Sequence, residues 1–248
     1  MIILKSPREI ERMRTSCKIV AEILALLSDR VKPGISTIEL EEVALKETVK
    51  YNAIPAFKGY CNFPNALCCS PNQQVVHGIA NRIPLESGDI LSIDFGVLFN
   101  GYYGDAAVTV PVGSVSDSVL KLLSVTHESL YKGIAAALPG NRLFDISYSI
   151  QSYVESFGFS VVRDFVGHGI GKNLHEDPQI PNYGVPGQGI KLKPGMVFAI
   201  EPMINQGSHD VKVLSDGWTV ETVDGCLSAH FEHTVAITEN GPDILTRL

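Results

Sequence analysis

The stretch ILSIDFGVLFNGYYGDAAVTV, residues 90–110, decides the fold that this sequence predicts. Two apolar runs flank the dipeptide Asn100-Gly101, which is the strongest short signal for a two-residue β-hairpin turn. The pattern predicts one strand over residues 90–96 and a second strand from about residue 102 to residue 110. The two strands should therefore pair antiparallel.

The turn also fixes the register of the hairpin. Phe99 faces Tyr102, and Gly96 faces Asp105. Asp94 lies two residues from Gly96, so Asp94 and Asp105 are diagonal neighbours on one face of the sheet, with backbones roughly 7–8 Å apart. Two carboxylates at that spacing can converge on metal ions that lie between them.

The surroundings of the two aspartates leave two interpretations open. Strand positions disfavour Asp, and the flanking residues are strongly apolar. A pair of buried carboxylates without partners is costly, whereas bound metal ions would remove that cost. The alternative is that both aspartates are solvated on an exposed face, and the hairpin alone does not decide between the two.

The segments around the hairpin predict two similar halves. Leu85–Asp94 and Leu192–Glu201 share the pattern Leu-x-x-Gly-x-x-x-(small)-Ile-(acid). In each half this pattern follows two helical patterns that a Pro-Gly turn separates, which predicts two related α+β halves facing each other. The predicted helices span Pro7–Leu27, about Thr37–Tyr51, Val115–Leu138 and Leu143–Gly158.

No linker or low-complexity stretch divides the chain of 248 residues, which is long enough to bury a sizeable core. We therefore expect an α+β fold with a central antiparallel sheet. The expected organisation is a single domain of residues 1–248, with pseudo-repeat halves at about residues 1–112 and 113–248.

Composition and charge exclude several classes of protein. A hydrophobic content of 45% and a charged content of 19% are typical of a soluble globular protein. The net charge is −7 and the basic residues are scattered, so we expect no nucleic-acid partner. Ile19–Leu27 is too short to span a bilayer, which predicts no membrane association. Five cysteines without a C-x-x-C pair favour free thiols, and we expect a cytoplasmic protein without a signal segment.

Three further residues could complete a site with the two aspartates. Glu201 ends an apolar strand over residues 196–202, and Glu232 lies in a predicted strand over residues 229–237. Taken singly, each is more typical of a salt-bridged glutamate. His168 stands between glycines in Gly167–Gly171, which would let the backbone approach a site closely. The glycine offsets match neither a dinucleotide fingerprint nor a phosphate-binding loop, and an ordinary turn is the alternative.

Together these residues have the composition of a dinuclear metal site. Four carboxylates and one imidazole suit Mn, Fe, Co or Zn, and carboxylates can bridge two ions. Two ions roughly 3.5–4 Å apart can share a water and generate hydroxide at neutral pH. The predicted ligands are Asp94, Asp105, His168, Glu201 and Glu232.

At this point the sequence resembles the methionine aminopeptidase family of metallopeptidases, whose fold is called the pita-bread fold. Each motif is weakly specific, but their common order is highly specific. The roughly thirty residues between His168 and Glu201, and the absence of a Cys/His-rich N-terminal extension, resemble the short bacterial type. The motifs are Val75–Gly78, Asp89–Asp94, Gly101–Asp105, Gly167–Gly171, Phe198–Pro202 and Phe231–Thr234.

The resemblance implies roles for the metal ligands. Asp94 would chelate one ion, and Asp105 and Glu232 would bridge both ions. His168 and Glu201 would complete the shell of the other ion. A metal-bridging hydroxide would attack the first carbonyl, and Glu201 is the family's candidate for accepting its proton.

The resemblance also assigns two catalytic histidines that are not ligands. His77 would contact the substrate near the scissile amide and assist proton transfer. His175 would hydrogen-bond the carbonyl oxygen and stabilise the oxyanion. Read from the sequence alone, either histidine is more typical of an ordinary loop residue.

A small apolar methionine pocket is implied as well, although core packing alone would also explain its residues. Phe63 departs from the tyrosine expected in the family, and Leu174 stands where an aromatic residue is expected. The pocket residues would be Tyr60, Phe63, Cys68 and Trp218. Three further positions, Asn72, Gln74 and Ser228, resemble a site for a monovalent cation (Na or K) in some relatives.

The function implied by the resemblance is removal of the initiator methionine from nascent proteins whose second residue is small. The partners would be N-terminal peptides at the ribosome exit, and the enzyme would be a monomer. One alternative is an Xaa-Pro aminopeptidase or prolidase, which usually carries a further N-terminal domain. Another alternative is a non-catalytic peptide-binding protein on the same fold, which should have lost metal ligands.

Overall fold

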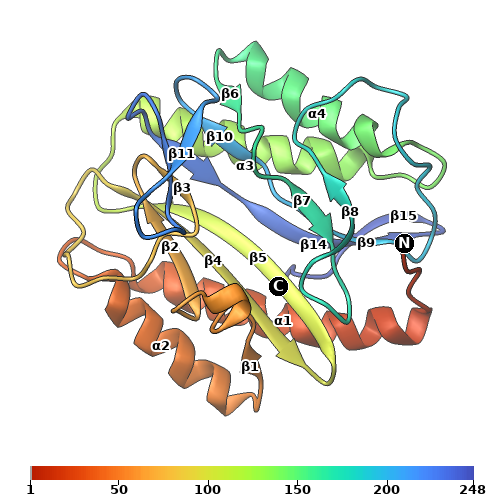
Figure 1. Ribbon diagram of the computed structural model, residues 1–248, viewed down its shortest axis with the longest axis horizontal. Helices are drawn as coiled ribbons and strands as arrows, with labels where there is room; N and C mark the ends of the chain where they lie inside the picture. Colours follow the sequence, from red (N-terminus) through yellow and green to blue (C-terminus); the bar gives the residue numbers. More distant parts are fainter. Residues whose placement is uncertain (1) are drawn as a thin grey trace.

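A curled antiparallel sheet forms the centre of the computed structural model, which describes residues 2–248 (Figure 1). Its strand order is β1-β4-β5-β14-β9-β7-β8, with β2 also paired to β4 and β15 to β14. The strands are β1 (Ile54–Pro55), β2 (Leu67–Pro71), β4 (Ile90–Phe99), β5 (Tyr102–Pro111), β7 (Gly167–Gly169), β8 (Glu176–Ile180), β9 (Val197–Ile200), β14 (Glu232–Thr238) and β15 (Gly241–Ile244).

Two small three-stranded sheets flank the central one. Their strand orders are β13-β10-β6 and β11-β12-β3. The strands are β3 (Gln74–Val76), β6 (Ser160–Val161), β10 (Met203–Asn205), β11 (Val211–Val213), β12 (Val220–Thr222) and β13 (Ser228–His230).

The predicted hairpin is confirmed residue by residue. Phe99 pairs with Tyr102 and Gly96 with Asp105, while Asp94 pairs with Ala107. Strand β4 runs three residues further than expected, up to the turn at Asn100, because the first strand stays paired along its whole length.

Four α-helices cover the sheet at the predicted places: α1 (Pro7–Arg30), α2 (Thr37–Lys50), α3 (Asp117–Ala136) and α4 (Leu143–Ser156). A capping box precedes α1, in which the Ser6 backbone N–H donates to the Glu9 carboxylate at 2.8 Å. Helix α1 continues past Leu27 to Arg30 and ends before Lys32-Pro33, because a residue before proline avoids helical geometry. The apolar pattern thus stops one turn before the helix does.

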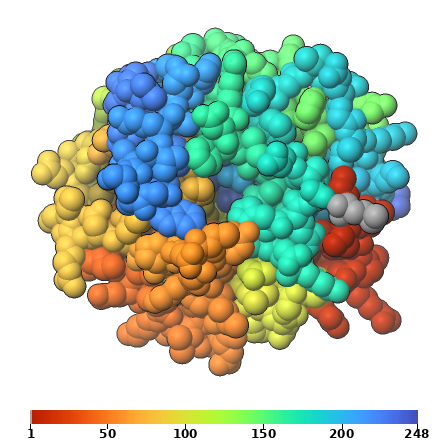
Figure 2. Space-filling view, viewed as in Figure 1, coloured from red at the N-terminus to blue at the C-terminus, as the bar shows by residue number. Residues whose placement is uncertain are grey.

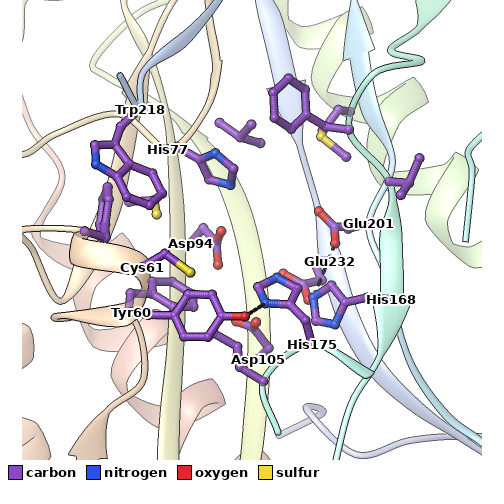
Figure 3. Close-up of a pocket in the computed structure, with 18 of the residues that line it drawn as sticks. Tyr60, Cys61, His77, Asp94, Asp105, His168, His175, Glu201, Trp218 and Glu232 are labelled. Atoms are coloured by element: carbon purple, nitrogen blue, oxygen red, sulfur yellow. Dashed lines mark hydrogen bonds and ion pairs between the residues drawn. The ribbon is translucent and has the colours of Figure 1, made fainter. Parts of the chain in front are cut away.

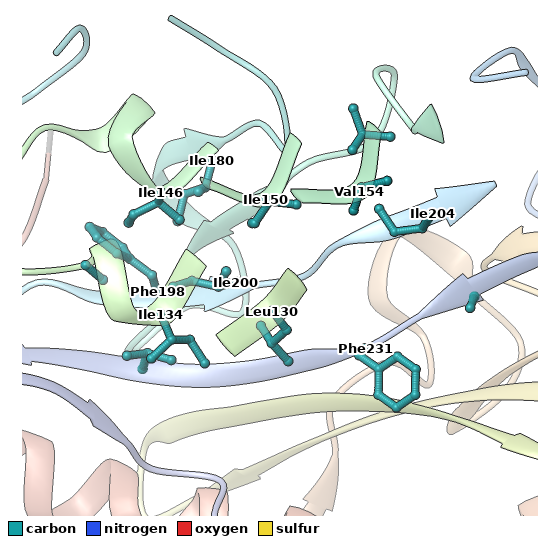
Figure 4. Packing of buried hydrophobic residues seen from close by; sticks show 14 of the residues in the cluster. Leu130, Ile134, Ile146, Ile150, Val154, Ile180, Phe198, Ile200, Ile204 and Phe231 are labelled. Carbon is teal, nitrogen blue, oxygen red and sulfur yellow. The ribbon is translucent and has the colours of Figure 1, made fainter. Parts of the chain in front are cut away.

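The helices form two layers with separate cores. Helices α1 and α2 pack with β2, β4 and β5, in a core that includes Ile23, Leu40 and Phe95. Helix α3 packs against β9 and β14, and helix α4 packs against α3, β6 and β8. Leu130, Ile150 and Phe198 are buried together in this second core (Figure 4). A pseudo-repeat division near residue 112 stays a prediction. Within residues 2–248, no helix is long and apolar enough to cross a membrane.

The prediction of one continuous strand over residues 229–237 is wrong. The expected strand over residues 229–237 is divided at Phe231 into β13, which pairs with β10, and β14, which pairs with β9. The break follows the partner strand, because Glu201 and Pro202 separate β9 from β10 and the Phe231 N–H donates to the Pro202 carbonyl. Glu232 therefore opens β14 instead of lying mid-strand.

Candidate metal centre

The five predicted metal ligands converge at the floor of one cavity of about 340 Å³ (Figure 3). Each ligand comes from a different part of the central sheet. Asp94 lies on β4, Asp105 on β5, His168 on β7, Glu201 directly after β9 and Glu232 at the start of β14. The strand order brings these segments together although they are far apart in the sequence.

The register of three neighbouring strands explains how the carboxylates meet. Asp94 on β4 and Glu232 on β14 both pair with Ala107 on the strand between them. Asp105 lies two residues from Ala107, on the same face of β5. The small alanine side chain leaves space in the middle of this row of carboxylates.

Thr234 fixes the backbone of Asp105 within this row. Its hydroxyl donates to the Asp105 carbonyl at 2.7 Å and accepts from the Asp105 N–H at 3.2 Å. Thr234 is two residues after Glu232 on β14. The same strand therefore carries one carboxylate and holds another in place.

His168 is oriented as a ligand. Its Nδ1 atom lies 2.9 Å from the Gly169 carbonyl, which can only accept, so the ring proton resides on Nδ1. The lone pair of Nε2 then faces the site, where Nε2 lies 3.6 Å from Oε1 of Glu201. Ligand atoms of Asp105, His168 and Glu232 all lie within 4.8 Å of one another. Burial lowers the pKa of His168 to about 3, which keeps the imidazole neutral.

The carboxylates fit a cation. One oxygen each of Asp94, Asp105 and Glu232 is buried without a hydrogen-bond partner in the described chain. Burial raises the pKa of Asp94 to about 7 and that of Glu201 to about 8. Burial and neighbouring carboxylates also raise the pKa values of Asp105 and Glu232 well above their usual range. Such groups become charged at neutral pH when divalent cations compensate them, so the donor set fits divalent metal ions.

The two predicted catalytic histidines line the same cavity. His77 follows β3 with a φ of 59° and packs edge-on against the ring of Phe165, at 5.6 Å between centroids. Burial lowers its pKa to about 4. The Nδ1 atom of His175 lies 2.8 Å from the Tyr60 hydroxyl (Figure 3). Both rings lie beside the five predicted ligands, and their roles as catalytic groups that are not ligands stay predictions.

The four predicted pocket residues, Tyr60, Phe63, Cys68 and Trp218, also line the cavity. Phe63 and Trp218 meet edge to face at 5.2 Å between ring centroids. Leu174 lines the cavity as well, although its side chain is almost fully buried. Sequence reasoning missed several lining residues that no local signal marks: Phe57, Cys61, Val76, Asp164, Phe165, Val166, Gln179 and Met203.

His230 is a second omission from the predicted site. Its Nε2 atom is buried without a hydrogen-bond partner in the described residues and lies 3.5 Å from Oε2 of Glu201. The Thr109 hydroxyl holds its backbone by accepting from the His230 N–H and donating to its carbonyl. The available signal was its position, two residues before Glu232 on the same predicted face.

Comparison with known proteins decides the family. The model of metallopeptidase family M24 matches residues 11–239. Methionine aminopeptidase 1 of Bacillus subtilis (strain 168) is 58% identical over 248 residues, the full length of both chains. The crystal structure of methionine aminopeptidase from Rickettsia prowazekii is 44% identical, with a TM-score of 0.98 and full coverage of both chains.

The chain belongs to metallopeptidase family M24. Within this family it groups with the methionine aminopeptidases, so the predicted class of metal-dependent aminopeptidase is confirmed. The predicted pita-bread fold is confirmed too. Prolidase from Pyrococcus furiosus has the same fold, with 25% identity and a TM-score of 0.81, but the chain covers only 66% of that protein.

The three residues proposed for a monovalent cation lie outside the cavity of this M24 peptidase. The Asn72 carbonyl accepts from the Ser228 N–H at 3.0 Å, so two of the three segments are in contact. Gln74 pairs with Glu221 in the neighbouring strand. A cation at these residues stays a prediction.

Proposed function

We propose that the protein removes the initiator methionine from nascent proteins whose second residue is small. The observation that carries this proposal is the joint placement of two features in one cavity. Five metal-type ligands form its floor, and an apolar, partly aromatic wall stands beside them. The names of the full-length relatives support the same reaction.

The cofactors in this proposal are two divalent ions, with Co, Mn, Fe and Zn all compatible with the donors. Asp94 would hold one ion, His168 and Glu201 the other, and Asp105 and Glu232 would hold both. When bound, the two ions would lower the pKa of a shared water and polarise the scissile carbonyl. The unpartnered oxygens of Asp94, Asp105 and Glu232 support this assignment.

His175 serves as a hydrogen-bond donor in the proposed reaction. The Nδ1 atom of His175 lies 2.8 Å from the Tyr60 hydroxyl, and the proposed role uses the tautomer in which this hydroxyl donates to Nδ1 and the ring proton lies on Nε2. Partial burial lowers the pKa of His175, so the ring stays neutral near pH 7. A neutral donor beside the ligands can stabilise negative charge that develops on the carbonyl oxygen.

Two other groups handle protons. His77 is neutral at pH 7, since burial lowers its pKa to about 4, and it can exchange a proton near the scissile amide. Glu201 carries a buried carboxylate at the edge of the ligand set and accepts the proton that the attacking water loses. Both groups line the same cavity.

The substrate side chain would lie against Tyr60, Phe63, Cys68 and Trp218. A thioether makes favourable contacts with aromatic rings, so methionine suits this wall. The confined volume of the cavity would exclude bulky second residues. The partners are therefore the N-terminal peptides of new proteins, at the ribosome exit.

We place the enzyme in the cytoplasm, and the five free cysteines support a reducing compartment. A monomeric enzyme is part of the same proposal. A monovalent cation (Na or K) at Asn72, Gln74 and Ser228 is part of the same proposal.

Hydrolysis of three peptides by the metal-loaded protein tests this function. Met-Ala-Ser should be cleaved far faster than Leu-Ala-Ser, because the apolar wall favours the unbranched thioether. Ala-Pro-Ala is the substrate of the Xaa-Pro alternative and should remain intact. Preferred cleavage of Ala-Pro-Ala would overturn the methionine assignment.

A further inference from the structure

A buried ion pair joins two segments far apart in the sequence. The Nζ atom of Lys5 lies 2.5 Å from Oε2 of Glu176, and the side chains are only 4% and 5% exposed. Burying two charges costs solvation free energy, which good geometry and further hydrogen bonds must offset. This pair is therefore a specific structural link, unlike the mobile ion pairs of an exposed surface.

Glu176 is the residue after His175, and its carboxylate closes the loop that carries this histidine. Its Oε1 atom accepts from the backbone N–H groups of Lys172 at 2.9 Å and Asn173 at 3.2 Å. Gly171 makes the arrangement possible. A Cβ at this position would lie 2.5 Å from Cε of Lys5 and 2.7 Å from Oε1 of Glu176.

Lys5 is itself anchored to the sheet. Its backbone N–H donates to the Gly195 carbonyl at 2.7 Å, in the turn just before β9. Strand β9 leads directly to Glu201. Lys5 thus connects the loop before β8 with the strand that leads to a metal ligand, and Figure 2 shows this loop (teal) against the red N-terminal residues.

The His175 ring depends on such anchoring because its own surroundings are open. The residue is exposed at the cavity, and its Nδ1 contacts the Tyr60 hydroxyl at 2.8 Å. On the other side, its ring centroid lies 4.2 Å from that of His168. The chain on either side of His175 must therefore be fixed for the ring to keep this place.

We propose that Lys5 is a positioning residue for His175, acting through its buried ion pair with Glu176. The loop at residues 171–176 keeps its geometry because Lys5 neutralises the carboxylate that binds the loop's own N–H groups. The catalytic consequence rests on the proposed role of His175. The effect on loop geometry does not.

Three variants of the full chain separate this role from general stability. Lys5→Met removes the charge but keeps an unbranched apolar side chain, and Glu176→Gln removes the opposite charge at constant size. Lys172→Met is the matched control. It removes a lysine charge from the same loop, but the Lys172 side chain is 66% exposed. Each variant is compared by hydrogen exchange of residues 170–176, by calorimetric Mn²⁺ binding, and by kcat and KM for Met-Ala-Ser.

Lys5→Met and Glu176→Gln should both speed exchange at residues 172 and 173 by at least tenfold. Both should lower kcat about 10- to 100-fold, since a misplacement of about 1 Å at a catalytic group has effects of that size. KM and Mn²⁺ affinity should stay within about twofold, because the ligands lie on other strands. Lys172→Met should match the unmodified protein in every measurement.

Unchanged exchange in a folded Lys5→Met or Glu176→Gln protein would overturn the proposal. If Lys5→Met does not fold, Glu176→Gln carries the test alone. A loss of Mn²⁺ affinity equal to the loss of kcat would also overturn it, because the pair would then act on the metal centre. Should the unmodified protein cleave none of the peptides, the proposed function fails, while the exchange data still judge the loop.

Discussion

Asp94 and Asp105 project from one face of the β4–β5 hairpin, two register positions apart, with Ala107 and Gly96 as their respective partners. The turn at Asn100-Gly101 sets this relationship. One residue more in the turn would move one carboxylate to the opposite face of the sheet, because side chains alternate along a strand. The geometry of the metal centre therefore begins with a two-residue turn.

Replacement of Asp105 by asparagine should reduce peptide hydrolysis by about two orders of magnitude or more, because it weakens a ligand in the middle of the set. The amide keeps the shape of the side chain, so the fold should persist. Steady-state kinetics and calorimetric Mn²⁺ binding measure the effect. Asp29→Asn, at an exposed aspartate, is the control, and equal activity of both variants would argue against Asp105 as a ligand.

The stability of the metal-free protein should fall as pH rises from about 6.5 to 8. The folded-state pKa of Asp94 is about 7 and that of Glu201 about 8, against ordinary values of 3.8 and 4.5. For a carboxyl group whose pKa is raised on folding, stability falls by up to about 1.4 kcal/mol per pH unit between the ordinary and the folded pKa, so a fall that begins near pH 4 continues until about pH 8. Denaturant unfolding in the presence of a chelator measures the slope.

The buried histidines affect stability only at lower pH, so they do not contribute to the decline between pH 6.5 and pH 8. The pKa values of His77 and His233 are lowered to about 4 from 6.5, so their contribution is complete above pH 6.5 and is lost toward pH 4. Saturating Mn²⁺ should abolish or reverse the decline above pH 6.5, because metal binding favours the deprotonated ligands. A metal-free protein whose stability increases from pH 6.5 to pH 8 would contradict the raised pKa values of the buried carboxyl groups.

Alanine at His77 or at His175 should lower kcat about 100- to 1000-fold while the protein still binds metal. Neither ring is among the five proposed ligands, so the metal content after dialysis should match that of the unmodified protein. Alanine at His127, which lies on α3 away from the cavity, serves as the comparison. Loss of metal together with activity in His77→Ala would instead make His77 a ligand.

Phe63→Ala should raise KM for Met-Ala-Ser about tenfold, because it removes the edge-to-face contact with Trp218 from the apolar wall. Phe63→Tyr keeps the ring and should change KM less than about twofold. Both variants are compared at constant metal loading. If the alanine variant keeps its KM, the wall does not bind the methionine side chain.

Much of the fold could be predicted from local patterns. The hairpin register follows from Asn100-Gly101, and the four helices follow from their helical patterns and from the Pro-Gly turns that separate them. The break at Phe231 could not be predicted from the sequence. It arises because β13 pairs with β10 in a small sheet, whereas β14 pairs with β9 in the central sheet. Strand boundaries of this kind are set by partners that lie elsewhere in the chain.

Some residues of the site could likewise be grouped from local sequence, and others could not. Asp94 and Asp105 could be placed together from one hairpin, whereas His168 and Glu201 meet only through the pairing of β7 with β9. Their grouping came from the order of the motifs. His230 could have been found from its position two residues before Glu232, whereas Lys5 carried no such signal, since Lys5 and Glu176 are 171 residues apart. Contacts at that separation become visible only in three dimensions.

Titration of the metal-free protein with Mn²⁺ during Met-Ala-Ser hydrolysis tests the central claim most directly. The claim is that Asp94, Asp105, His168, Glu201 and Glu232 bind the ions on which the peptidase depends. We expect no turnover in the presence of chelator, a rise with added metal, and saturation by two equivalents per chain, with no rise for Asp105→Asn. Full turnover by the chelator-treated protein would contradict the account.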